Sequence, residues 1–122
     1  MLENIKNKNV IFTGSFSLFI RGLVNSYNDI DIVVISENEI DGITWYDSNS
    51  IYAKKQRQGF LKLDSGKIID AFLEDAFPEF EEIDGYKLKG LEEIKRDFLE
   101  LLNSNIRSHW KKDIESKLKL LQ

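Results

Sequence analysis

Two aspartates interrupt an apolar stretch of the chain, "NDIDIVVIS", at residues 28–36. Side chains alternate between the two faces of a β-strand, so Asp29 and Asp31 would share one face, about 6.6 Å apart along the strand. Two ionised carboxylates this close repel each other, and burying them without compensation costs several kcal/mol. The pair therefore predicts a bound divalent cation.

A third acid, Asp70, interrupts a similar apolar run, "KIIDAFLE", at residues 67–74. If its strand lies beside the first, three carboxylates meet on one face, and such hard oxygen ligands suit magnesium or manganese better than zinc. Three acids can hold two metal ions about 3.5–4 Å apart, which stabilises both the attacking and the leaving oxygen in phosphoryl transfer. The sequence thus predicts a phosphate substrate. Asp64 is an alternative third acid, but it precedes Ser65-Gly66, where a role in a turn is favoured.

The pair Gly14-Ser15 follows the apolar run "NVIFT" at residues 9–13. Glycine allows the backbone to approach a ligand closely, and the free N–H groups at the start of a helix, with the Ser15 hydroxyl, can bind an anion. A plain turn and cap is the commoner meaning of Gly-Ser before a helix. The ordered combination with three acids inside apolar runs favours a phosphate site.

The elements that must position these residues follow from the hydrophobic pattern. Residues 9–13 predict a buried strand, Ser15 stands at an N-cap position, and the helix after it has Phe16, Phe19, Ile20 and Leu23 at helical spacing. Residues 30–36 predict a central strand. Short strands are expected at 43–47 and 51–55, and a hairpin turns at 64–66. The stretch around Pro78 suggests one helical turn and one short strand, and two helices follow from Leu91, with a break at 103–105.

Composition bounds the class of protein. With 122 residues, 42% hydrophobic and 31% charged, the chain predicts a single folded domain. Its α/β (α+β) architecture would be a mixed sheet flanked by helices, with a motif core at 9–73 and a helical part at 90–122. The formal charge of −4 argues against a general nucleic-acid coat protein. The sequence has no cysteine, no apolar run long enough for a membrane and no leader-like N-terminus, so we expect a cytoplasmic protein without a membrane partner.

These motifs together resemble the nucleotidyltransferase superfamily related to polymerase β, most closely its minimal members, including small antitoxin-like and lincosamide-nucleotidyltransferase-like proteins. The resemblance rests on Gly14-Ser15, thirteen intervening residues, Asp29-Ile30-Asp31, and Asp70 in "IIDAF". It implies a metal-dependent transfer of a nucleoside monophosphate from a nucleoside triphosphate such as ATP to a hydroxyl acceptor, with release of pyrophosphate.

The same resemblance implies a role for each matched residue. Asp29 and Asp31 would be ligands of Mg²⁺ or Mn²⁺, and Asp70 would help to hold the catalytic metal and act as the base for the acceptor hydroxyl. Gly14 and Ser15 would contact the terminal phosphates of the nucleotide. Lys112, in a Lys-Asp pair of the last helix, would reach the nucleotide phosphates.

The resemblance leaves the acceptor open among a small molecule, an RNA end and a side chain of a toxin-like partner protein, and a homodimer would complete the cleft. The alternative is a catalytically inactive nucleotide- or partner-binding module of the same fold, such as an antitoxin component. Lys62 could face the site and contact phosphate, although a solvated strand lysine is more common.

Overall fold

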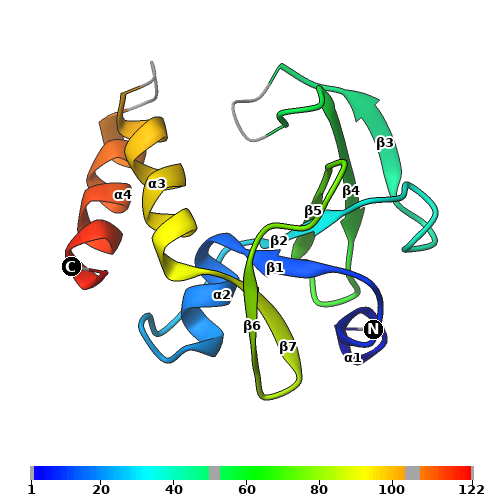
Figure 1. Cartoon of the computed structure of the whole chain (residues 1–122), viewed down its shortest axis with the longest axis horizontal. Helices are drawn as coiled ribbons and strands as arrows, with labels where there is room; N and C mark the ends of the chain where they lie inside the picture. Colours follow the sequence, from blue (N-terminus) through cyan, green and yellow to red (C-terminus); the bar gives the residue numbers. More distant parts are fainter. Residues whose placement is uncertain (1, 50–52, 104–107, 122) are drawn as a thin grey trace. The chain divides into compact units, whose positions relative to one another are not determined.

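The computed structural model describes residues 2–49, 53–103 and 108–121. The chain divides into two compact units, Met1–Lys89 and Gly90–Gln122. The first unit contains a seven-stranded mixed sheet with two short helices, and the second contains two longer helices (Figure 1). The mixed α and β class and the mixed sheet are thereby confirmed, while the single domain stays a prediction.

The sheet has the strand order β3-β4-β5-β2-β1-β7-β6. Its strands are β1 (Ile11–Thr13), β2 (Ile30–Val34), β3 (Thr44–Asp47), β4 (Arg57–Lys62), β5 (Ile68–Leu73), β6 (Phe80–Ile83) and β7 (Tyr86–Lys89). The pairs β2–β5 and β1–β7 are parallel, and the other neighbours are antiparallel. Two predicted elements are confirmed here, the central strand β2 and the β4–β5 hairpin.

Two expectations about the strands are wrong. Residues 51 and 52 of the strand predicted at 51–55 lie outside the described residues, while 53–55 belong to no strand and β4 begins at Arg57. The stretch after Pro78 forms the hairpin β6–β7, without a helical turn. The hairpin forms because Asp84 and Gly85 both have positive φ, 53° and 82°, as a two-residue type I′ turn requires.

The helices of the described residues are α1 (Leu2–Lys6), α2 (Gly14–Ile20), α3 (Leu91–Leu102) and α4 (Ser108–Leu120). The last two confirm the predicted C-terminal helices, and the short α1 was not predicted. The N-cap of α2 is Thr13, so the assignment of Ser15 to that position is wrong. Because Gly14 adopts φ +64°, the helix can begin directly at the end of β1, and it stops at Ile20, before Leu23.

One face of the sheet carries the main core. Ile5 of α1 and Phe16 of α2 pack there among inward-facing strand residues, so both short helices cover the same face. The strand residues of this core include Phe12, Ile30, Ile32, Val34, Ile69, Ala71 and Leu88. Arg21, just after α2, donates hydrogen bonds to Glu81 and to the Lys89 carbonyl, which ties the helix to the β6–β7 hairpin. The residues that alternate with this core set point to the opposite face.

In the second unit, α3 and α4 contact each other through apolar stripes. The buried side chains are Ile94, Phe98 and Leu101 on α3, and Ile114 and Leu118 on α4. An ion pair of 2.7 Å joins Lys117 to Asp113 one turn earlier. In the part of the chain that the structure describes, none of the helices is both long and apolar enough to cross a membrane.

Gly59 in the middle of β4 should be intolerant of a side chain. A Cβ atom there would contact Cγ2 of Ile43 and lie 2.9 Å from Cδ2 of Trp45. Ile43 and Trp45 pack against the main core. Gly59→Ala should therefore lower the free energy of unfolding by about 2 kcal/mol through overpacking. Urea unfolding measures this, with Lys62→Ala, an exposed site on the same strand, as control. A change below about 0.5 kcal/mol, the size usual for a surface substitution, would show that the contact is relieved without cost.

Candidate active site

Asp31 and Asp70 lie directly opposite each other on the parallel strands β2 and β5. Neighbouring strands are about 4.8 Å apart, and directly paired residues point to the same face. Both side chains are half-buried, on the face opposite the main core. The strand of Asp70 thus lies beside that of Asp31, which was the condition for carboxylates to meet on one face.

Asp29 immediately precedes β2 and acts on Asp70 through its charge. Burial of the Asp70 carboxyl, and secondly the negative charge of Asp29, raise its pKa from 3.8 to about 6. Both effects disfavour the ionised form of Asp70. The two carboxylates thus repel each other when both are ionised. A bound cation or a proton would reduce this repulsion.

Gly14 lies against the carboxylate of Asp31. A Cβ atom at position 14 would contact Oδ2 of Asp31 and lie 3.2 Å from its Cγ. The backbone of Gly14 also has φ +64°, a conformation that side chains disfavour. Glycine is required here for two independent reasons, and the turn between β1 and α2 lies directly against Asp31.

Ser15 and Ser17 follow in the first turn of the seven-residue helix α2. Ser15 is half-buried, so its position beside Gly14 leaves it partly accessible. The Ser17 hydroxyl is fully buried and donates a 2.7 Å hydrogen bond to the Gly14 carbonyl. Ser17 was not predicted from the sequence, although a serine in the first turn of an apolar helix commonly bonds to a backbone carbonyl three residues earlier.

The fit of a metal ion to this face is partial. Three carboxylates are the oxygen donor set that magnesium and manganese prefer. Gly14 keeps the space beside Asp31 free of a side chain. However, in residues 2–49, 53–103 and 108–121 no three acidic, histidine or cysteine side chains converge closely enough to hold a metal ion. A bound cation would require the carboxylates to turn toward it.

Asp70→Asn should stabilise the protein in the absence of metal. The folded-state pKa of Asp70, about 6, lies above its ordinary value of 3.8, so the folded protein binds more protons between these pH values. Its stability must then fall as the pH rises from about 4 through 6, and the penalty is complete about one unit above pH 6. Discounted for solvent screening at a half-exposed group, removing the charge should gain about 1 kcal/mol at pH 7.5 and nothing near pH 4.

Urea unfolding in EDTA at both pH values measures this gain. The exposed hairpin residue offers a matched control, Asp64→Asn, which should change stability by less than about 0.5 kcal/mol at either pH. Equal stability of wild type and Asp70→Asn at pH 7.5 would contradict the strain at this carboxylate.

Tyr46 and Phe60 were not selected from the sequence and lie beside the acids. Phe60 of β4 is directly opposite Asp70, and the rings of Tyr46 and Phe60 are 6.2 Å apart between centroids. Burial, together with the charge of Asp70, raises the pKa of the Tyr46 hydroxyl. Strand alternation places both side chains on the face of Asp70. This can be recognised only once the pairing of β3, β4 and β5 is known.

Three further residues were considered from the sequence. Asp64 is exposed at the tip of the β4–β5 hairpin, away from any strand, in agreement with a role in a turn. Lys62 is the exposed last residue of β4, two residues after Phe60, so it lies on the face of the sheet that carries Asp70. Lys112 is exposed on α4, in the second unit, and its contact with a nucleotide stays a prediction.

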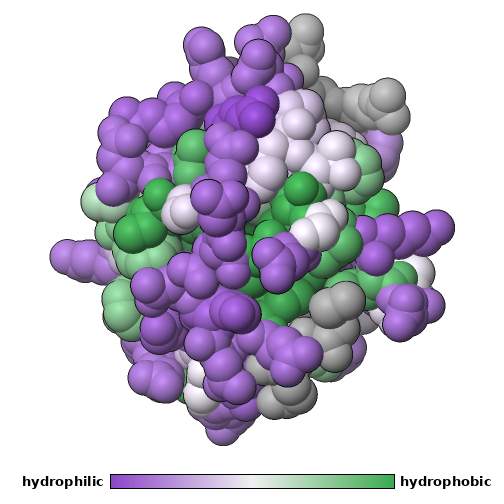
Figure 2. All heavy atoms as spheres, turned by 90° about the vertical axis from the view of Figure 1, so that its right-hand side faces the viewer, coloured by the Kyte–Doolittle hydropathy of each residue, from purple (hydrophilic) through white to green (hydrophobic). Residues whose placement is uncertain are grey.

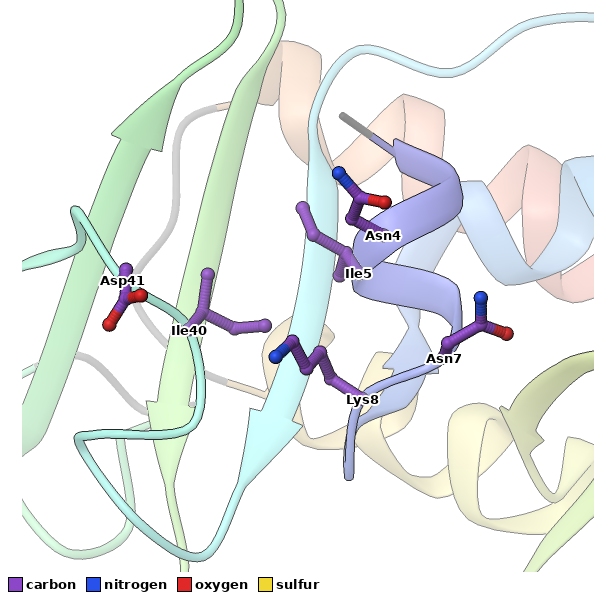
Figure 3. A pocket seen from close by; sticks show the side chains of 6 residues that line it. All are labelled: Asn4, Ile5, Asn7, Lys8, Ile40 and Asp41. Carbon is purple, nitrogen blue, oxygen red and sulfur yellow. The ribbon is translucent and has the colours of Figure 1, made fainter.

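A surface pocket of about 490 Å³ lies between α1 and the β2–β3 connection (Figure 3). Its lining consists of Asn4, Ile5, Asn7, Lys8, Ile40 and Asp41. Ile5 and Ile40 belong to the core on the covered face of the sheet, whereas the three aspartates of the motif do not line the pocket. The pocket is therefore a different place from the acidic face. We take the acidic face as the candidate active site, because its carboxylates can bind a metal ion or accept a proton.

Comparisons with known proteins identify no family. The chain matches no protein-family model, and it matches neither a curated protein nor a solved structure. The site must be interpreted from its own residues.

Proposed function

We propose that this protein is a magnesium- or manganese-dependent nucleotidyltransferase, which transfers a nucleoside monophosphate from a nucleoside triphosphate to a hydroxyl acceptor. The observation that carries the proposal is the meeting of Gly14 with the Asp31 carboxylate, on a strand directly paired with that of Asp70. This contact supports a common site for the glycine turn and the acids, which are separated in sequence.

In the proposed reaction, Asp29, Asp31 and Asp70 would hold the divalent metal. When bound, it would neutralise the negative charge of the phosphates and of the carboxylates. The acceptor oxygen forms a bond to the α-phosphorus, and the bond from that phosphorus to the pyrophosphate oxygen breaks. The acceptor proton passes to the carboxylate of Asp70, which acts as the general base. Gly14 and Ser15 would bind the terminal phosphates.

Pyrophosphate release tests the proposal. Each of the four ribonucleoside triphosphates is incubated with the protein, with Mg²⁺ or with EDTA, and with acceptor mixtures of small hydroxyl compounds, total RNA or a cell extract. We expect release with at least one triphosphate, dependent on the metal and on the acceptor. Mn²⁺ binding, measured separately by equilibrium dialysis, should weaken at least tenfold in Asp29→Ala.

The rival is a binding module without turnover, favoured by the absence of a preformed three-ligand cluster among the described side chains. It predicts nucleotide binding in calorimetry with a non-hydrolysable triphosphate, but no pyrophosphate release with any acceptor. Absence of both binding and release would contradict the two functions together and leave a structural α/β domain.

A further inference from the structure

A row of directly paired residues crosses the acidic face of the sheet. Thr13 of β1 pairs with Asp31, Asp31 with Asp70, Asp70 with Phe60, and Phe60 with Thr44. Each step is one strand spacing of about 4.8 Å. Gly14 follows Thr13 at one end of the row, so the glycine turn, the acids and an aromatic ring succeed each other in this order.

Phe60 of this row forms an aromatic pair with Tyr46 of β3. Their side chains are 39% and 43% exposed, and their rings meet at an interplanar angle of 57°. Tyr46 pairs with Gln58, two residues before Phe60 on the same strand, so both rings lie on the face of Asp70. Large aromatic side chains left accessible beside half-buried acids provide a surface on which a flat ring can stack. Figure 2 looks onto the side of the molecule that carries the β3 edge, where a hydrophobic area is framed by hydrophilic side chains.

The geometry of phosphoryl transfer indicates which substrate reaches this pair. The attacking and the leaving oxygen stand roughly in line on opposite sides of the phosphorus. If the pyrophosphate lies at Gly14 and Ser15, the acceptor oxygen must approach from the side of Asp70 and β4. The oxygen that links the phosphorus to the donor's own nucleoside is equatorial, so it does not point along this line toward Asp70 and β4.

We propose that Tyr46 and Phe60 bind a flat ring of the acceptor molecule, so that a hydroxyl group attached at or near this ring reaches Asp70. The acceptor class is thus an aromatic or heteroaromatic hydroxyl compound, and the two residues determine specificity without taking part in the chemistry. This inference rests on the proposed function for the direction of the reaction, but ring binding can be measured without turnover.

Two probes distinguish the sources of such a ring. Adenosine carries sugar hydroxyls beside a heteroaromatic base, and N-acetyltyrosinamide carries a phenol, while ribitol is a polyol without a ring. We expect at least one ring probe to bind the wild type in NMR titrations, and ribitol not to bind. The variant Tyr46→Ala/Phe60→Ala should weaken binding of that probe about tenfold or more.

Phe80→Ala is the matched control, because Phe80 is also an exposed strand phenylalanine, 48% exposed, on β6 at the opposite edge of the sheet. It should leave probe binding unchanged. The inference is overturned if neither ring probe binds the wild type, or if the double variant binds as tightly as the wild type. It is also overturned if the double variant loses binding of a non-hydrolysable triphosphate, since the pair would then hold the donor's base. Failure of the proposed function shows differently, as absent pyrophosphate release with every acceptor whatever the ring binding.

Discussion

Asp31→Asn is expected to lower kcat/KM for the proposed nucleotidyl transfer by about 10³-fold. The substitution keeps the shape of the side chain but removes a carboxylate from β2, the strand that lies between β1 and β5. Magnesium and manganese bind charged carboxylates, and an amide provides a weaker ligand. Pyrophosphate release under saturating Mg²⁺ measures the loss, and Mn²⁺ dialysis should show a parallel decrease in metal affinity.

A purely structural role for Asp31 makes the opposite prediction. In that case Asp31→Asn would change stability and leave metal affinity as it is. Urea unfolding in EDTA separates the two, because it measures the stability of the metal-free protein, to which a metal ligand role contributes nothing. Asp64→Asn on the hairpin tip is the control for loss of a surface charge. Unchanged metal affinity in Asp31→Asn would contradict the assignment of this residue to the metal.

Local patterns were sufficient to predict the central elements of the fold. Apolar, β-branched runs predicted β2, and two alternating runs around Asp64-Ser65-Gly66 predicted the β4–β5 hairpin. The helical spacing after Leu91 predicted α3 and α4. The hairpin β6–β7 was missed although Asp84-Gly85 is a strong turn signal, because Pro78 and the acidic residues near it suggested a connection.

The candidate site could be predicted in its residue types but not in its register. Acids inside apolar runs are costly, and this cost alone identified Asp29, Asp31 and Asp70 as unusual. That Asp31 and Asp70 are directly opposite depends on long-range strand pairing, since a shift by one residue would place them on different faces. Tyr46 and Phe60 join the site only through two further pairings, so no local pattern could select them.

Gly14→Ala tests the contact that joins the two halves of the site. Alanine at φ +64° should cost about 1–2 kcal/mol of stability. Its Cβ atom must in addition displace the Asp31 carboxylate. Misplacement of a reacting group by about 1 Å can cost about 10²-fold in rate, so we expect a loss of at least that size in kcat/KM.

Gly66→Ala separates the two effects of this substitution. Gly66 also has positive φ, +91°, but a Cβ atom there would meet no neighbour within 4 Å. It should therefore share the backbone cost and leave transfer and Mn²⁺ affinity unchanged. If both alanine variants lose activity equally, the backbone conformation and not the contact with Asp31 is responsible.

A double-mutant cycle then assigns the remaining cost of Gly14→Ala to Asp31. In an Asp31→Ala background the carboxylate that the new Cβ atom would strike is absent. Gly14→Ala should consequently destabilise this background by only the backbone cost, about 1–2 kcal/mol, and the wild type by more. Residues in contact give such non-additive changes, whereas independent sites add within about 0.5 kcal/mol. Additive losses of stability would mean that the glycine turn and the acid of β2 do not act as one site.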